Sequence, residues 1–211
     1  MLLEGDSLAV ANGPHVGHLQ GSFCMGRRCA PTKKAISTFR QVLAGVTPEQ
    51  TSYTTPCASF DVGQLINHTI STQHMVIDAL QDKPFNMSGV EVARDEQAAA
   101  FDRSAADAVT ELRRDGAPDK VITLPFGTFS CGKFMGLAVL DTFQHAWDLA
   151  KATGQKTDLH AELAESLMDL AVAHMANVPR GEEPAPYGPE QTAPAGAPAA
   201  DRLAAFLGRA V

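Results

Sequence analysis

The stretch from Lys133 to Thr153 constrains the fold most, because it has the pattern of one long helix that is apolar on two sides. At about 100° per residue, one apolar stripe shares the face of Asp141 and a second lies on the far side. The first stripe holds Phe134, Leu137 and Ala138, and the second holds Val139, Leu140, Phe143 and Trp147. A helix with two apolar sides is normally buried. The sequence therefore predicts a helix enclosed by other helices.

Five further segments have helical spacing or composition. They cover residues 33–45, 61–80, 91–114, 161–176 and 201–207. Asp61 is a suitable N-cap for the second of these segments. The segments between them are predicted to be a linker at 47–59, an extended or turn-like stretch at 121–130 and a Pro/Ala/Gly-rich surface crossing at 179–198. Because helices dominate, the sequence predicts an all-α bundle with short extra C-terminal helices.

Length and composition limit the domain organisation and the partners. The 211 residues suffice for one domain, predicted over residues 31–211, after an irregular N-terminal extension at 1–30. No apolar run approaches the roughly 20 residues that span a bilayer, and residues 1–21 lack the pattern of a secretory signal. We therefore expect a cytoplasmic protein. A net charge of -7 argues against nucleic acid and against a polybasic membrane contact.

The cysteines do not form a recognisable metal motif. None of the four belongs to a C-x-x-C pair, so free thiols are expected in a reducing compartment. Cys57 and Cys131 are predicted to be small buried hydrophobes. One N-terminal series superficially resembles a zinc cluster, but it lacks regular spacing and a scaffold; it consists of His15, His18, Cys24 and Cys29.

Asp141 and His145 carry the chemistry of the long helix. From Phe134 to Trp147 the only full charge is Asp141. The i, i+4 spacing places both side chains about 6 Å apart on one face. Burying them is costly unless they are paired or bind a metal ion. A hydrogen-bonded core pair and a metal site are therefore both open, with Asp148 as an outer or surface acid.

A mononuclear metal site normally needs a third protein ligand. His68 is the best candidate, because it lies at one margin of the apolar face of residues 61–80, in line with Thr72 and Met75. A single interior histidine is also often just a hydrogen-bonded core residue. His74 is predicted to face solvent, and neither His160 nor His174 has an acidic partner at ligand spacing.

Two motifs resemble a known family. Residues 55–68 resemble the signature TPC-x-x-W-x-V-x-x-L-x-x-H of actinobacterial DinB-like metal-binding proteins, which are grouped with the N-terminal domain of mycothiol-dependent maleylpyruvate isomerase. Residues 141–154 resemble its second signature, and the tail around 187–189 and 206–209 is similar as well. Phe60 stands where the signature has Trp, and Asp141 stands where the isomerase branch has Glu. The resemblance covers residues 33–209, and this chain is expected to lack the C-terminal domain of the full isomerase.

The resemblance implies a DinB-like four-helix bundle with a divalent metal at one end of its core. Its ligand positions fall on His68, Asp141 and His145. Two histidines and one carboxylate leave room for water or a thiolate. The helical setting favours Zn²⁺, with Ni²⁺ as the alternative, over the Fe(II) of β-scaffold oxygenases. A homodimer is a further expectation.

Three functions follow as hypotheses. The first, suggested by the resemblance, is a transferase or isomerase that uses the low-molecular-weight thiol mycothiol on a small electrophile. The second is a metal-dependent hydrolase, for which Asp148 is the one nearby candidate for a general base. The third is a non-catalytic metal-binding or small-molecule-binding protein.

Overall fold

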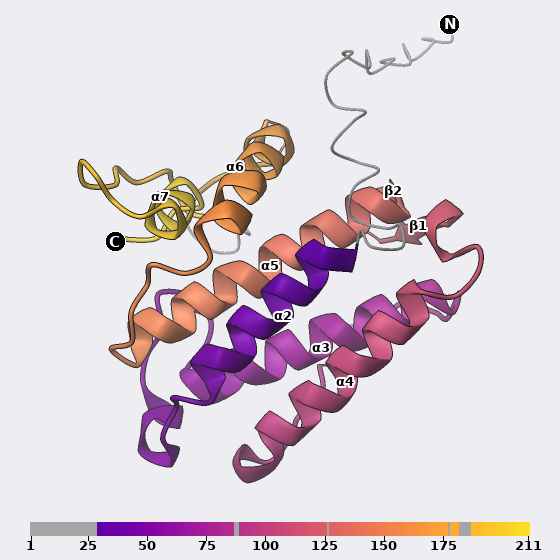
Figure 1. Ribbon diagram of the computed structural model, residues 1–211, viewed down its shortest axis with the longest axis horizontal. Coiled ribbons are helices and arrows are strands. Elements are labelled where there is room, and N and C mark those ends of the chain that lie inside the picture. Colours follow the sequence, from indigo (N-terminus) through magenta and orange to yellow (C-terminus); the bar gives the residue numbers. More distant parts are fainter. Residues whose placement is uncertain (1–28, 87–88, 126, 177, 182–186) are drawn as a thin grey trace, which may run out of the picture.

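Four long helices form a bundle, as the sequence predicted. The computed structural model describes residues 29–86, 89–125, 127–176, 178–181 and 187–211, so nearly all of the predicted N-terminal extension lies outside the described residues. The bundle consists of α2 (Ala30–Leu43), α3 (Val62–Leu80), α4 (Gln97–Leu112) and α5 (Cys131–Ala152). Helix α2 packs against α4 and α5, and α3 packs against the same two helices (Figure 1).

Two C-terminal helices pack outside the bundle. Helices α6 (Ala161–Met175) and α7 (Ala199–Phe206) contact each other and α5. Every residue of α5 from Thr142 to Ala150 is buried. Ala146 and Leu149 pack in the bundle core, whereas the Trp147 indole donates a hydrogen bond to Asp201 of α7 at 2.7 Å. Helix α5 is therefore enclosed by other helices, and the buried members of both predicted stripes belong to one hydrophobic cluster that also includes residues of α6 and α7.

Helix α3 begins where the sequence predicted. The Asp61 carboxylate accepts a hydrogen bond from the Gln64 backbone N–H at 2.8 Å, and the Gln64 side chain accepts one from the Asp61 N–H at 2.9 Å. This capping box satisfies two backbone donors of the first turn. It fixes the start of α3 one and a half to two turns before His68.

Helix α4 begins later than predicted. The pattern indicated a helix from residue 91, but residues 91–93 are not helical, η3 (Arg94–Glu96) is a 3-10 turn, and α4 starts at Gln97. The Val90 N–H donates to the Ser71 hydroxyl at 2.8 Å, and the Asn67 amide donates to the Val92 carbonyl at 3.4 Å. These bonds to α3 hold the segment extended and override its helix propensity.

The remaining elements are short. Two 3-10 helices, η2 (Pro48–Ser52) and η4 (Ala117–Asp119), lie in connections. The segment predicted to be extended forms an antiparallel hairpin of β1 (Val121–Leu124) and β2 (Gly127–Ser130). Three helices begin earlier than predicted, α2 at Ala30, α5 at Cys131 and α7 at Ala199.

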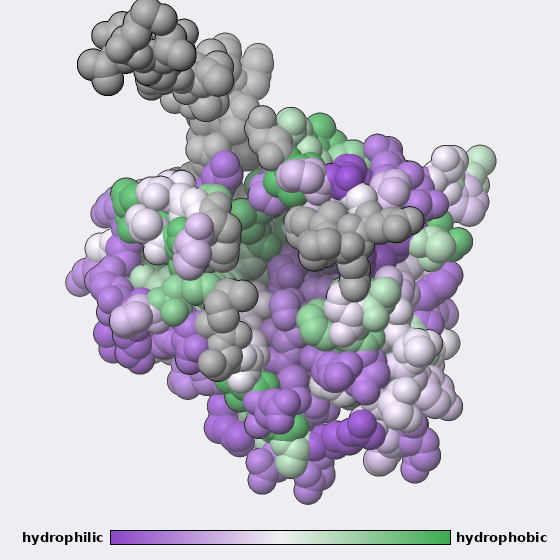
Figure 2. Space-filling model, turned by 180° about the vertical axis from the view of Figure 1, so that it is seen from behind, coloured by the Kyte–Doolittle hydropathy of each residue, from purple (hydrophilic) through white to green (hydrophobic). Residues whose placement is uncertain are grey.

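The described surface is mainly polar. Among the described residues the large exposed hydrophobics are Tyr53, Val121 and Val172, which lie on separate elements. The face shown in Figure 2 is largely hydrophilic, with apolar residues in small patches. Among the described helices, none has the length and apolar character needed to cross a membrane. The expected homodimer stays a prediction.

Candidate metal centre

The three predicted ligands converge between α3 and α5. His68 projects from α3, and Asp141 and His145 lie one turn apart on α5. The Asp141 Oδ1 atom is 3.5 Å from His68 Nε2 and 3.4 Å from His145 Nε2. The two imidazole rings meet edge to face, with their centroids 4.9 Å apart. One nitrogen from each histidine therefore faces the same carboxylate oxygen.

These distances fit a shared divalent cation. Zinc binds imidazole nitrogen and carboxylate oxygen at about 2.0–2.2 Å, so two ligand atoms of a tetrahedral site lie about 3.3–3.5 Å apart. The observed separations match that edge and exceed the usual 2.7–3.2 Å of an N–H···O hydrogen bond. The His68 and Asp141 side chains are 35% and 32% exposed, whereas that of His145 is 8% exposed. The group can therefore be reached from the His68 side.

The carboxylate of Asp141 and the imidazole of His145 shift each other's pKa. Burial by itself would raise the pKa of Asp141, but the neighbouring His145 and His68 lower it well below its usual range. Burial would likewise lower the pKa of His145, but Asp141 and then Asp148 outweigh it and raise that pKa to about 10. In the metal-free protein His145 therefore carries a proton, which a metal ion would have to displace.

Asp148 orients the His145 imidazole from the Nδ1 side, opposite the proposed metal. Its carboxylate is fully buried, and its Oδ2 lies 3.1 Å from His145 Nδ1. Arg209 donates to both oxygens of Asp148, through Nε at 2.9 Å and Nη2 at 3.1 Å. Burial opposes the charge of this carboxylate, but the hydrogen bonds from His145 and Arg209 hold its pKa below the ordinary value. This arrangement keeps the proton on Nδ1 and directs Nε2 toward Asp141.

Asp148 is therefore an outer acid, one of the two roles that the sequence left open. Its oxygens are occupied by Arg209 and His145, and the Gln144 amide donates a further bond at 3.3 Å. A general base needs a free lone pair within reach of water or substrate. The predicted hydrolase role of Asp148 does not fit this geometry.

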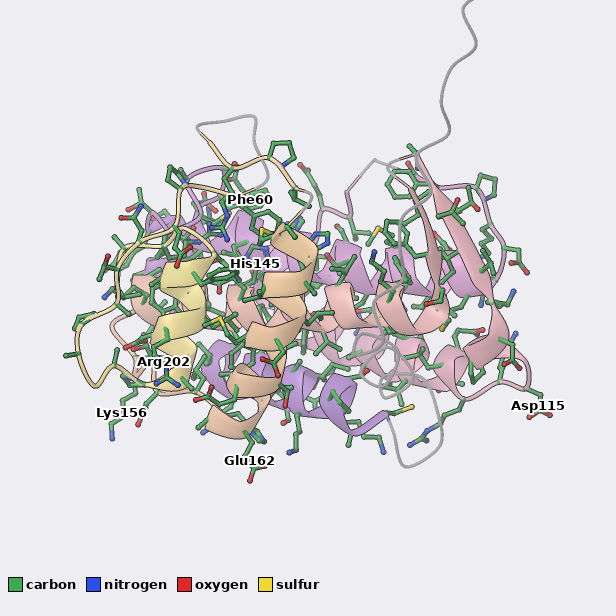
Figure 3. All side chains as sticks on the ribbon, turned by 90° about the horizontal axis from the view of Figure 1, so that it is seen from above. Phe60, Asp115, His145, Lys156, Glu162 and Arg202 are labelled. Carbon is green, nitrogen blue, oxygen red and sulfur yellow. The ribbon has the colours of Figure 1, made fainter. Side chains whose placement is uncertain are left out.

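Two more residues, for which the sequence predicted no such role, support the ligands. The Thr72 hydroxyl donates to Asp141 Oδ2 at 3.0 Å, which fixes the carboxylate while Oδ1 faces the histidines. The Phe60 ring stacks on His68 with a centroid distance of 4.9 Å. Figure 3 shows Phe60 beside His145, whereas the charged Asp115 and Glu162 lie at the periphery. The spacing of Thr72, one turn after His68, was the available sequence signal.

Arg209 and Tyr187 reach the site from the C-terminal segment. Asp148 and Arg209 are 61 residues apart in the chain, so no local pattern pairs them. Burial, followed by the charge of Asp141, raises the pKa of Tyr187 to about 12, so its hydroxyl stays protonated at neutral pH. Gly188 and Gly208 approach so closely that a Cβ on Gly208 would lie 2.8 Å from Gly188 backbone atoms. The absence of a side chain at Gly208 therefore lets the segments that carry Tyr187 and Arg209 pack closely against each other.

Cys57 lies beside the site, which the prediction of a buried hydrophobe did not anticipate. It is half-buried, and it forms with His145 and Asp148 a second group of potential metal ligands. Because Arg209 occupies both oxygens of Asp148, this group suits a cation less well than the first. Burial raises the pKa of the Cys57 thiol. Cys131, by contrast, is fully buried in the core, as predicted.

The other histidines lie elsewhere. His74 is exposed, as predicted. Neither His160 nor His174 belongs to a group of three potential ligands within the described part of the chain. The N-terminal series that superficially resembled a zinc cluster lies, except for Cys29, outside the described residues, and Cys29 is buried.

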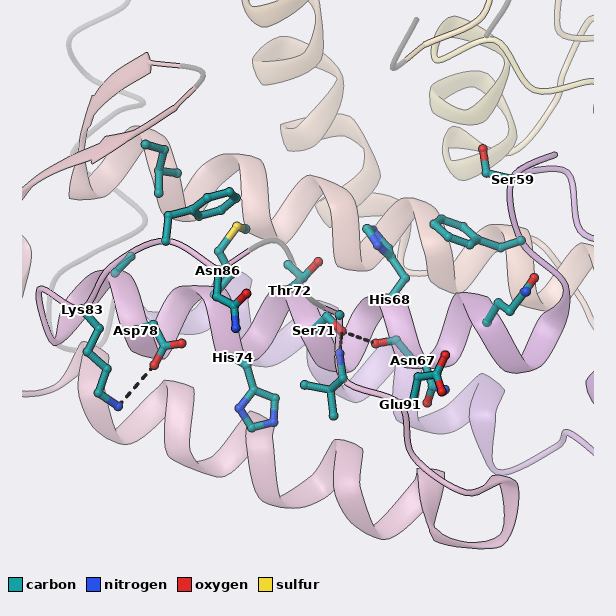
Figure 4. A pocket seen from close by; sticks show the side chains of 18 residues that line it. Ser59, Asn67, His68, Ser71, Thr72, His74, Asp78, Lys83, Asn86 and Glu91 are labelled. Atoms are coloured by element: carbon teal, nitrogen blue, oxygen red, sulfur yellow. Dashed lines mark hydrogen bonds and ion pairs between the residues drawn. The ribbon is translucent and has the colours of Figure 1, made fainter. Parts of the chain in front are cut away.

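A groove of about 620 Å³ opens onto the site along α3 (Figure 4). His68 and Thr72 form part of its wall. Other wall residues come from the segment that follows α3 and from Leu124 of β1. Figure 4 shows the Asp78–Lys83 ion pair toward one end and the Asn67 and Glu91 side chains toward the other. A small molecule in this groove would lie next to His68.

Fold and site together define a class: a four-helix bundle with a His/Asp/His group between two of its helices. Residues 33–150 match the family described as "Mycothiol maleylpyruvate isomerase N-terminal domain". The chain therefore belongs to that family, as the two sequence motifs indicated.

Relatives and solved structures agree with this assignment. Uncharacterised proteins from two strains of Mycobacterium tuberculosis, CDC 1551 / Oshkosh and ATCC 25618 / H37Rv, are each 35% identical over 182 residues, which cover 85% of this chain and 96% of each relative. The crystal structure of the mycothiol-dependent maleylpyruvate isomerase matches with a TM-score of 0.60 at 14% identity, over 71% of this chain and 68% of that one. A mutant of the same enzyme matches with a TM-score of 0.58. At this identity the structures establish the shared DinB-like fold alone.

Proposed function

We propose that this chain is a divalent-metal-dependent enzyme that uses mycothiol. It either transfers the thiol to a small electrophile or uses the thiol to isomerise that electrophile. The observation that carries the proposal is the convergence of His68 Nε2 and His145 Nε2 on Asp141 Oδ1 at 3.5 and 3.4 Å, beside a groove that admits a ligand. Membership of a family described by mycothiol supports the choice of thiol. The nitrogen and oxygen donors favour Zn²⁺, with Ni²⁺ as the alternative.

The residues of the chain would position the metal and the thiol, and the metal would make the thiol more acidic. A bound Zn²⁺ would lower the pKa of a coordinated thiol and so provide a thiolate near neutral pH. Asp148 and Arg209 hold His145 in the orientation that this requires, and Thr72 holds Asp141. The sulfur forms a bond to the electrophilic carbon and the thiol proton passes to solvent. Transfer ends when a leaving group departs with its bonding electrons, and isomerisation ends when the sulfur is expelled again.

The test compares two histidines on the same helix. His68→Ala removes a proposed ligand, whereas His74→Ala removes an exposed histidine of the same groove that belongs to no ligand group. We expect His68→Ala to lose bound metal and mycothiol-dependent turnover together, and His74→Ala to keep its bound metal. Metal content is measured by elemental analysis and turnover by loss of free thiol. Turnover that survives the loss of metal in His68→Ala would refute the proposal.

The alternatives correspond to other outcomes of the same experiment. Ester or amide cleavage without thiol would indicate a hydrolase, for which the buried, ion-paired Asp148 offers no base. Stoichiometric metal without turnover across thiol and ester substrates would indicate a binding protein.

A further inference from the structure

The groove along α3 has two chemically different arms that meet at the candidate metal centre. Its wall residues on α3 recur every three or four positions, so they share one helix face. Before His68 the face carries polar side chains, Gln64 and Asn67. After Thr72 it carries the apolar Met75 and Ala79 and, alongside them, the polar His74 and Asp78. Phe85 and Leu124 from neighbouring segments line the groove as well. We refer to Met75, Ala79, Phe85 and Leu124 as the apolar arm.

The apolar arm lies within reach of the site. Helical side chains lean toward the N-terminus of their helix, so Met75 covers the surface next to Thr72. Thr72 in turn donates its hydrogen bond to Asp141. A molecule whose reacting atom lies at His68 and whose body extends along the groove past Thr72 would therefore lie against Met75. Small-molecule sites of this kind gain most of their affinity from apolar wall area.

The charges of the groove disfavour an anion. Lys83 is the one Lys or Arg among its described wall residues, and its Nζ lies 3.3 Å from Asp78 Oδ1. Glu91 adds a carboxylate at the other end, and the whole chain carries a net charge of -7. The two positive charges of a bound Zn²⁺ would be offset by Asp141 and a coordinated thiolate. A dicarboxylate would therefore lack a free cationic side chain in this wall and would be repelled by the field of the protein. Maleylpyruvate, for which the family is named, is such a dicarboxylate.

We propose that the apolar arm binds the electrophile, and that this electrophile is an uncharged, largely apolar small molecule rather than a dicarboxylate. The inference rests on the proposed thiol function and specifies its substrate class. Thiol transfer to such a molecule forms a carbon–sulfur bond, releases the leaving group with its bonding electrons and gives the thiol proton to solvent. The polar arm is left for the body of the thiol.

Two product analogues that differ in one charge test the inference by binding. S-(4-carbamoylbenzyl)mycothiol and S-(4-carboxybenzyl)mycothiol have nearly the same shape. Their dissociation constants are measured by calorimetry against metal-loaded protein, with unsubstituted mycothiol as the reference. We expect the uncharged conjugate to bind about tenfold more tightly than the carboxylate, and more tightly than mycothiol itself.

Substitutions in the apolar arm locate the effect. Met75→Lys places a cation there and should remove or reverse the preference, whereas the matched Met75→Leu should keep it. Ala79→Lys provides a second cation position if Met75→Lys does not fold. Equal affinity for the two conjugates, or a preference unchanged by both lysine variants, would overturn this inference and leave the thiol function standing. Failure of mycothiol itself to bind the metal-loaded protein would overturn both.

Discussion

The Asp148 carboxylate shows how one buried charge can depend on a residue far along the chain. It is fully buried, and Arg209, whose side chain is 13% exposed, neutralises it with two hydrogen bonds. Such a pair adds little net stability when intact, but removing one partner leaves an uncompensated buried charge. Asp148 in turn holds His145, so the effect should reach the metal centre.

Arg209→Ala should therefore be costly in two ways. We expect a loss of about 3–5 kcal/mol of unfolding free energy and metal binding weakened by about 10- to 100-fold. The control is Arg40→Ala, which breaks an exposed pair with Asp102 and should cost at most about 1 kcal/mol. Urea unfolding and metal titration measure the two effects. Similar small losses in both variants would contradict the role assigned to Arg209.

The protonation of His145 predicts how stability depends on pH. Its pKa rises from 6.5 to about 10 on folding, so the charged imidazole stabilises the metal-free protein fully below pH 6.5. This contribution is lost as the pH rises from 6.5 toward 10. We expect the metal-free protein to lose stability over that range, measured by urea midpoints. His145→Gln should show no matching decline; a parallel decline in that variant would assign the effect to another group.

At the scale of elements, α5 explains both the fold and the site. Its apolar pattern on two sides predicted a helix enclosed by other helices, and α2, α3, α6 and α7 all pack against it. Its capped partner α3 was also predicted from Asp61. The late start of α4 was not predicted, because the hydrogen bonds that hold residues 90–92 extended come from Ser71 and Asn67 on another helix.

The turn after α7 gives a prediction at this scale. Gly208 has a φ of +96°, and a Cβ there would lie 2.8 Å from backbone atoms of Gly188. Gly208→Ala should therefore lower the stability by more than the roughly 1 kcal/mol of backbone strain alone, and should weaken metal binding through Arg209. Gly154→Ala is the matched control, because Gly154 has a φ of +70° but nothing within 4 Å of the added Cβ. Thermal unfolding of both variants measures the two losses of stability. Equal losses in Gly208→Ala and Gly154→Ala would contradict the effect assigned to the contact with Gly188.

At the scale of the whole molecule, a metal between α3 and α5 would link two halves of the bundle. A ligand that binds only the folded state stabilises it by mass action. At a free Zn²⁺ concentration of about 100 times Kd the gain is about 2.7 kcal/mol, which for a chain of this size raises the melting temperature by roughly 5–10 °C. Calorimetric scans with Zn²⁺ should show this shift in His74→Ala but not in His68→Ala. A shift that persists in His68→Ala would place the metal elsewhere.

The sequence by itself determined the helices, the central position of α5 and the pairing of Asp141 with His145, because helical periodicity and burial cost are local properties. His68 was identified only as the best third candidate, and the family resemblance strengthened that choice. The tertiary structure decided which side chains surround these three. Thr72 contacts Asp141 across the packing of α3 on α5, and Arg209 contacts Asp148 across 61 residues of chain. No periodic pattern within one helix encodes such contacts. It also decided the role of Asp148, since whether an acid on α5 faces solvent or Arg209 depends on where the C-terminal segment packs.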